Sequence, residues 1–371
     1  MNTPVASQLN ILLMSMELGN KEWRLRFSNQ IREREVVIPA RDLGALRQAI
    51  ATSRKKLGLS EGCGVVSCYE AGRDGFWLHR CLEKMGVENL VVDSASIEVN
   101  RRKRRAKTDR VDAQKLLGML VRHVIYQEKK MWQIVKVLTE AQEDARRRHR
   151  EQDRLKKERT GHVARIKSLL VLHGISAKRL NPKVETYRDW ANAPLLEATR
   201  EELRREFERL EIVEKQIREL GKNRMQHIES ESTPGDRATA KLMRLKSIGL
   251  ETASALGFEL FGCRKFNNRR QVGSFAGLTG TPYQSGDSNH EQGISKAGNV
   301  RVRHKMVEVS WLWLRFQKES ALTKWYFKQY GPDSHRKRRV GIVAVARKLL
   351  VALWKYVEFG EMPEGALLKV A

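Results

Sequence analysis

The order of apolar runs in residues 1–125 constrains the fold of this chain more than any other sequence feature. Short apolar or alternating runs predict β-strands, and stretches with apolar residues three and four apart predict amphipathic helices. Three strands come first, and helices then alternate with two more strands. The expected strands cover residues 11–16, 23–27, 36–38, 64–69 and 89–92, and the expected helices cover residues 43–50, 77–85 and 109–122. This order predicts an α/β unit.

Acidic residues stand where two of these strands end and where the last helix begins. Glu17 closes the first strand and Glu70 closes the fourth. Asp109 and Asp112 share one face of the helix because they are three residues apart. The element order and the positions of the acids are those expected of a ribonuclease H-like fold.

Carboxylates are suited to hold hard cations such as Mg²⁺, and two such ions can clamp the attacking and leaving oxygens of a phosphodiester. We therefore predict a nuclease site in which the four acids bind Mg²⁺ or Mn²⁺. The alternative is an ordinary helix start, with Thr108 as the N-cap and the two aspartates in the first turn.

The chain carries a large excess of positive charge. It has 71 Lys and Arg residues against 44 Asp and Glu residues, which gives a formal net charge of +27. A polyanion is the natural partner of such a chain, and nucleic acid is the commonest one. A basic block stands just before the two aspartates and is expected to bring phosphates to them. The predicted contacts in this block are Arg101, Arg102, Arg104, Arg105 and Lys107.

An acidic membrane surface is the alternative partner, but the sequence disfavours a membrane protein. No run of about 18 apolar residues is present to form a transmembrane helix. We expect no signal peptide, because the first residues lack a basic region followed by an apolar core. The four cysteines form no CxxC pair, which argues against a zinc ribbon and fits reduced, buried thiols in a cytoplasmic protein.

The central part of the chain is dominated by charged residues with a narrow apolar stripe. Leu203, Leu210, Val213, Ile217 and Leu220 fall on a and d positions of a heptad. Two long helices joined by a loop are expected here, as a coiled coil within the chain or across a dimer. The alternative is a solvated helical linker.

The last part of the chain is expected to be mostly helical, with two features that suggest nucleic-acid binding. Residues 245–253 resemble a helix-hairpin-helix turn, which would aim backbone N–H groups at a phosphate; an ordinary turn between helices is the alternative. A polar, glycine-rich loop then covers residues 275–299. Ser295 and Lys296 are expected to position a phosphate, and Arg301 and Arg303 to contact the nucleic-acid backbone.

Three stretches resemble the motifs of the DEDD transposases of the insertion sequence 110 family. They are Tyr69-Glu70-Ala71, then Lys107-Thr108-Asp109-Arg110-Val111-Asp112-Ala113, and a long stretch that contains Phe275-Ala276-Gly277-Leu278-Thr279, Tyr283-Gln284-Ser285-Gly286 and Ile294-Ser295-Lys296-Ala297-Gly298-Asn299. The resemblance covers nearly the whole chain. It implies a RuvC-like nuclease domain in residues 1–128, a coiled-coil region in residues 129–235 and a transposase domain in residues 236–371.

The resemblance also implies roles for residues and partners. Ser285 corresponds to the nucleophile, and Glu17, Glu70, Asp109 and Asp112 correspond to the metal-binding acids. The implied function is a DNA transposase or recombinase that is guided by a structured noncoding RNA, acts on donor and target DNA as a dimer or tetramer, and works in the nucleoid of a prokaryotic cell. Alternatives are a metal nuclease that uses water, and an inactive nucleic-acid-binding relative.

One position departs from the family pattern. The first acid of the family is normally Asp, whereas this chain has Glu17, which is one methylene longer. A misplacement of about 1 Å can cost about a hundredfold in rate. Position 17 therefore keeps the inactive alternative open.

Overall fold

A computed structural model describes residues 10–97, 109–129, 131–285, 288–331 and 335–369. The basic residues at positions 101–105 and Lys107, which we expected to contact nucleic acid, lie outside these ranges. The chain divides into two compact units, Met1–Leu138 and Thr139–Ala371.

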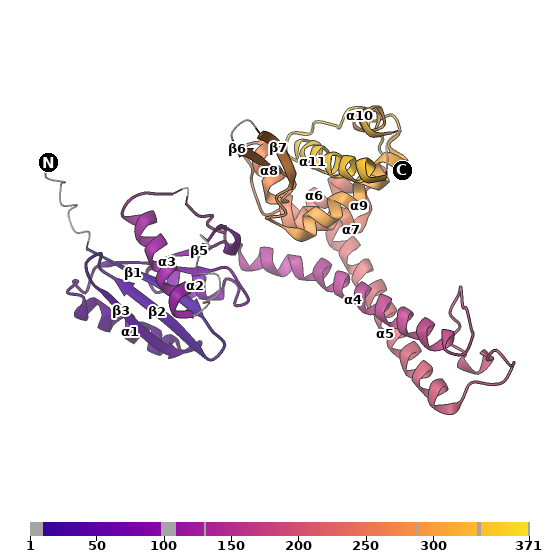
Figure 1. The fold of residues 1–371 in the computed structure, drawn as a ribbon, viewed down its shortest axis with the longest axis horizontal. Helices are drawn as coiled ribbons and strands as arrows, with labels where there is room; N and C mark the ends of the chain where they lie inside the picture. The colour runs from indigo at the N-terminus through magenta and orange to yellow at the C-terminus, as the bar shows by residue number, and fades with distance from the viewer. Residues whose placement is uncertain (1–9, 98–108, 130, 286–287, 332–334, 370–371) are drawn as a thin grey trace. The chain divides into compact units, whose positions relative to one another are not determined.

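The first unit contains a mixed five-stranded sheet flanked by helices (Figure 1). Along the chain its elements are β1 (Ile11–Leu18), β2 (Glu22–Ser28), β3 (Glu33–Pro39), α1 (Leu43–Lys56), β4 (Gly64–Glu70), α2 (Trp77–Lys84), β5 (Val87–Val92), η1 (Ser94–Ser96) and α3 (Asp109–Val124). The strand order is β3-β2-β1-β4-β5, with β1, β2 and β3 antiparallel and with β4 and β5 parallel to β1. The element order predicted from the sequence is confirmed.

Each face of the sheet has its own apolar core, because successive side chains of a strand point to opposite faces. On β1, Leu12, Met14 and Met16 pack with residues of α1 and α2. The alternate residue Leu13 packs with Leu116 and other residues of α3 on the second face. Helices α1 and α2 therefore cover one face of the sheet, and α3 covers the other.

The second unit begins with two long helices, α4 (Glu140–Val171) and α5 (Glu197–Glu229), which pack side by side as a helical hairpin (Figure 1). Thr139 starts α4 with a capping box, in which its hydroxyl accepts from Gln142 N and the Gln142 side chain accepts from Thr139 N. Buried contacts between the helices include Ile166 and Leu170 against Leu203. The connection contains the short helix η3 (Val184–Thr186).

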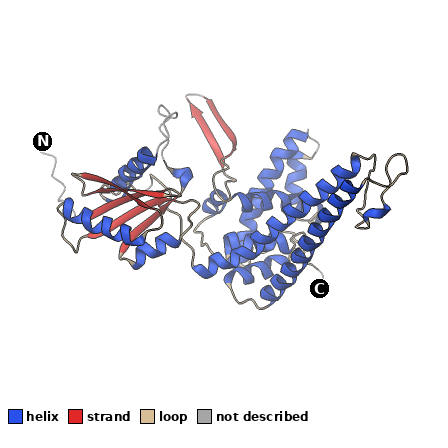
Figure 2. Cartoon of the chain, turned by 90° about the horizontal axis from the view of Figure 1, so that it is seen from below, coloured by secondary structure: helices blue, strands red, loops and turns tan. Residues whose placement is uncertain are grey.

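The rest of the second unit is mostly helical, as predicted, apart from one β-hairpin (Figure 2). Its elements are α6 (Pro234–Met243), α7 (Leu250–Leu256), the π-helix η4 (Gly257–Phe261), α8 (Arg269–Phe275), β6 (Gly280–Ser285), β7 (Ser288–Ile294), α9 (Val300–Phe316), α10 (Ala321–Tyr330) and α11 (His335–Phe359). Within the described residues, no helix is long and apolar enough to cross a membrane.

The hairpin β6–β7 corrects one expectation, since the sequence suggested a glycine-rich loop. Backbone bonds at its base explain the difference. Ser295 N donates to Thr279 O at 2.8 Å, and Lys296 N donates to Gly277 O at 3.1 Å. These bonds bring the two halves of the segment into register, so that Gly280 pairs with Ile294. A segment whose ends are fixed in this way can form antiparallel pairs despite its polar composition.

Candidate active site

Glu17 and Glu70 lie at the carboxyl ends of neighbouring parallel strands. The register pairs Met16 of β1 with Tyr69 of β4, so these two acids are the next residues on each strand. Both alternate onto the face that α3 covers, because Leu13 of β1 and Cys68 of β4 lie in the core on that face. The sheet thus places the two predicted ligands at the same end of the same face.

The first turn of α3 is fastened to this face close to the strand ends. The Ser15 hydroxyl donates to Ala113 O at 2.7 Å. Ser15 precedes Glu17 by two residues, and Ala113 directly follows Asp112, which is half-buried. Asp109 is the first residue of α3. The structure therefore brings the backbone of Asp112 close to the edge where Glu17 and Glu70 end their strands.

These residues fit a hard divalent cation in the chemistry of their donors. Carboxylate oxygens are the ligands that Mg²⁺ and Mn²⁺ prefer, and Glu70 is exposed. Among the side chains that the structure describes, which do not include that of Asp109, no three acidic, histidine or cysteine groups form a metal-binding cluster.

In the second unit, two glycine-containing motifs hold each other at close range. We call residues 275–279 and 295–299 the clamp. Asn299 N donates to Phe275 O at 2.7 Å, in addition to the two bonds at the base of the hairpin. Gly277 and Gly298 have φ angles of +63° and +119°, and a Cβ on them would lie 2.2 Å from Ala297 O and 2.4 Å from Phe275 O, respectively. Only glycine allows this approach of the two backbones.

Ser285 lies at the end of the hairpin that is away from the clamp, as the last residue of β6. It pairs in register with Ser288 of β7. The clamp fixes the base of the hairpin, so the backbone of Ser285 is presented at the tip. Ser285 and the strand-end acids belong to different units.

The other predicted phosphate contacts of this region lie around the clamp. Arg303 Nη1 donates to Ala276 O at 3.1 Å, so this arginine fastens the clamp. Arg301 Nη1 lies 3.0 Å from an oxygen of Asp153 on α4, with about half of its side chain exposed. Lys296 is exposed and Ser295 is half-buried.

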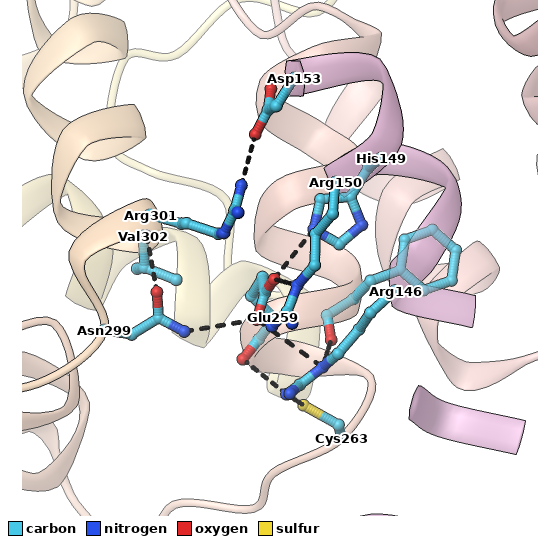
Figure 3. A network of polar contacts seen from close by, with 10 residues as sticks. Arg146, His149, Arg150, Asp153, Glu259, Cys263, Asn299, Arg301 and Val302 are labelled. Atoms are coloured by element: carbon cyan, nitrogen blue, oxygen red, sulfur yellow. Dashed lines mark hydrogen bonds and ion pairs between the residues drawn. The ribbon is translucent and has the colours of Figure 1, made fainter. Parts of the chain in front are cut away.

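A buried carboxylate near the clamp was not foreseen from the sequence. Glu259 lies in the π-helix η4 and has no exposed surface (Figure 3). Arg150 of α4 donates to both of its oxygens, at 2.7 and 2.9 Å, and His149 Nε2 lies 3.0 Å away. Burial opposes the charged form, but the hydrogen bonds from His149 and Arg150 outweigh it and hold the pKa of Glu259 well below its usual range.

The network around Glu259 reaches the clamp through Asn299. Its Nδ2 lies 3.4 Å from Glu259 Oε2, and its Oδ1 accepts from Val302 N at 3.1 Å as the N-cap of α9 (Figure 3). Arg146 of α4 adds a hydrogen bond to Phe258 O at 3.0 Å. Glu259 therefore ties α4 to the residues that support the serine hairpin. The only sequence signal was an acid inside the otherwise apolar run 255–261.

Comparisons with known proteins agree with one another. Residues 239–325, which contain the clamp, the hairpin and Glu259, match the model of the transposase family IS116/IS110/IS902. A Sinorhizobium fredii (strain NGR234) protein named "Putative transposase y4rJ" is 38% identical over 389 residues, which cover 99% of this chain and 97% of that protein. A Pseudomonas aeruginosa protein named "Probable family 20 transposase" is 26% identical over 227 residues, 59% of this chain and 65% of that protein.

Proposed function

Because this chain belongs to the IS116/IS110/IS902 family of transposases, we propose that it cuts and rejoins DNA through a covalent link between Ser285 and a DNA phosphate. The observation that carries this proposal is the position of Ser285 at the tip of a hairpin whose base is clamped by paired glycine motifs. A nucleophile at such a tip can enter a DNA groove while its base stays fixed. The net charge of +27 fits a polyanionic substrate.

In the proposed reaction the Ser285 hydroxyl attacks a backbone phosphorus. A bond forms between the serine oxygen and phosphorus, and the bond between phosphorus and the leaving sugar oxygen breaks. The serine proton passes to a carboxylate of the acid set and then to the leaving oxygen. Because the phosphoserine bond keeps the energy of the broken diester, the reverse reaction with a new sugar hydroxyl rejoins the strands.

The acids of the first unit complete the proposed site. Glu17, Glu70, Asp109 and Asp112 would hold Mg²⁺ or Mn²⁺, which stabilises charge on the phosphate and lowers the pKa of the attacking hydroxyl. The strand order and the strand-end position of the two glutamates support a ribonuclease H-like, RuvC-like fold for this unit. The acids and Ser285 must meet during the reaction, and a dimer or tetramer joined through the α4–α5 hairpin as a coiled coil would allow that.

The proposed partners are donor DNA, target DNA and a structured guide RNA. The excess of basic residues is large enough to neutralise many phosphates. Arg101, Arg102, Arg104, Arg105 and Lys107 immediately precede α3 in sequence and are proposed to bring phosphates to the acids. Sequence choice would then reside in base pairing with the RNA.

The proposal is tested by replacing the nucleophile. Ser285→Ala is expected to abolish covalent protein–DNA adducts on denaturing gels, in reactions with element-end DNA, the RNA transcribed beside the gene and Mg²⁺. Binding of the same DNA and RNA, measured by gel shift, is expected to be unchanged. The matched control is Ser288→Ala, which removes the hydroxyl at the paired position of β7. Adducts that persist in Ser285→Ala would place the nucleophile elsewhere, and free ends without adduct in the wild type would indicate a nuclease that uses water.

A further inference from the structure

A cavity of about 700 Å³ lies beside α6 in the second unit. Residues of α6 line it, together with Val357 and Glu358 from the C-terminal turn of α11. Phe261 of η4 and Glu231, which follows the end of α5, also line the cavity. None of the residues proposed above for catalysis lines this cavity, so its chemistry needs a separate explanation.

Three basic residues form a row along the cavity wall. Arg237 and Lys241 lie four residues apart on one face of α6, and Arg244, the C-cap residue of this helix, follows three residues later on the same side. The helix is buried on its other side through Thr239 and Leu242. The row is therefore held in place by a helix that packs firmly against the core.

Two of the three basic side chains in this row donate hydrogen bonds to backbone carbonyl groups. Lys241 Nζ donates to Val357 O at 3.0 Å, and Arg237 Nη1 donates to Glu231 O at 3.0 Å. Within the described residues, no carboxylate lies within ion-pair distance of Arg237, Lys241 or Arg244. Positioned cations without an ion-pair partner are suited to bind the phosphates of a nucleic-acid backbone.

The remaining lining is suited to unpaired bases. Phe261 is half-buried in the cavity wall, and aromatic side chains bind single strands by stacking on bases. The carboxylates of Glu231 and Glu358 can accept hydrogen bonds from base amino groups. The cavity volume is within the range of about 300–1,000 Å³ that is usual for small-ligand sites, which is room for one or two nucleotides.

We propose that this cavity, here named the α6 groove, binds a single-stranded segment of nucleic acid, with phosphates on Arg237 and Arg244 and a base against Phe261. The proposal rests on the proposed function in one respect, namely that nucleic acid is the partner. It adds a second binding site for unpaired nucleotides, apart from the hairpin that carries Ser285. Lys241 contributes charge while it also fastens α6 to the end of α11.

The test compares two double variants of the full-length protein. Arg237→Gln with Arg244→Gln removes two charges from the groove and leaves Lys241, which supports the packing. Arg218→Gln with Lys222→Gln removes two exposed charges from α5 and is the matched control. The probes are labelled oligo-dT and oligo-U of about 12 nucleotides, and binding is measured by fluorescence anisotropy over a range of salt concentrations.

The groove variant is expected to bind both probes about tenfold more weakly, with a salt dependence that is smaller by about 1.4 in log–log slope, as expected for two lost phosphate contacts. The slope of the control variant is expected to differ from the wild-type slope by less than about 0.7, which is half of the change expected for the groove variant. Ultraviolet crosslinking with iodouracil-substituted RNA and DNA is expected to label the peptide that contains Phe261, and the more efficient probe identifies the natural strand.

Equal salt slopes in the two double variants, or crosslinks that map only to other peptides, would overturn the α6 groove proposal. Ser285→Ala keeps the groove intact and is expected to bind both probes like the wild type. A failure of the adduct experiment with normal probe binding would therefore count against the proposed chemistry alone. Matching circular dichroism spectra and melting temperatures exclude unfolding as the cause of weak binding.

Discussion

The strand-end acids of the first unit and Glu259 of the second unit are carboxylates in opposite surroundings. Glu70 ends β4 in an exposed position, beside Glu17 on the next strand. Glu259 is completely buried, and both of its oxygens accept hydrogen bonds from α4. The exposed carboxylate of Glu70 is accessible to a ligand, whereas the hydrogen-bonding capacity of Glu259 is largely filled by the protein itself.

These two environments correspond to two roles of acidic residues in this protein, a structural role and a chemical role. A buried, strongly paired acid contributes to the structure, and removing it leaves its basic partners unpaired. An exposed acid at a strand end, such as Glu70, can take part in chemistry without leaving a buried partner unpaired when it is replaced. Replacing the buried acid should mainly lower stability, and replacing a strand-end acid should mainly lower the rate of DNA cleavage, when both properties are measured on the same variants.

The largest expected effect on stability comes from Glu259→Ala. It is expected to lower the free energy of unfolding of the second unit by about 3–5 kcal/mol, because Arg150 and His149 would lose their buried partner. Hydrogen exchange of peptides from residues 139–371 in the full-length protein measures this loss. Glu214→Ala is the control, since Glu214 forms a half-exposed pair with Arg159 and is expected to contribute about 0–1 kcal/mol. Equal losses of unfolding free energy in the two variants would show that the buried network around Glu259 stabilises the second unit no more than an exposed ion pair does.

The same contrast explains what could be predicted from sequence. Strands β1 and β4 were predictable because a short apolar run is a local signal, and the acids follow directly after these buried runs. The β6–β7 hairpin was missed because its pairing depends on the clamp, whose two halves are separated by the hairpin itself. Glu259 was missed because its partners lie on α4, more than 100 residues earlier. Long-range contacts of this kind leave no periodic pattern.

The next effect concerns activity instead of stability. Glu70→Gln and Glu17→Gln are each expected to lower the rate of metal-dependent DNA cleavage about a hundredfold or more, because a neutral amide is a poorer ligand for a divalent ion. Their melting temperatures are expected to stay close to that of the wild type. Single-turnover cleavage assays and thermal melts on the same preparations provide both measurements.

Glu88→Gln is the matched control for the strand-end acids. Glu88 is exposed on β5 and lies on the same face as Leu90 and Val92, but near the amino end of its strand. It is expected to keep the wild-type cleavage rate. If Glu88→Gln were as inactive as Glu70→Gln, the cleavage rate would depend on the total negative charge of this face. That result would contradict a specific metal-binding role for the acids at the strand ends.

The smallest expected effect is a difference in acid sensitivity. The pKa of Glu259 is depressed in the folded protein, so its contribution to stability is complete above the ordinary value of 4.5 and is lost as the pH falls below it toward the folded pKa. Between pH 5 and pH 4 the wild type is expected to lose about 1 kcal/mol more stability than Glu259→Gln. The carboxylate faces Arg146, His149 and Arg150 from α4 and Asn299 from α9, and His149 contributes the one imidazole among these four side chains. Repeating the titration in a His149→Gln background therefore isolates the carboxyl group, and parallel stability curves for the two proteins in that background would show that Glu259 is not held in its charged form by this network.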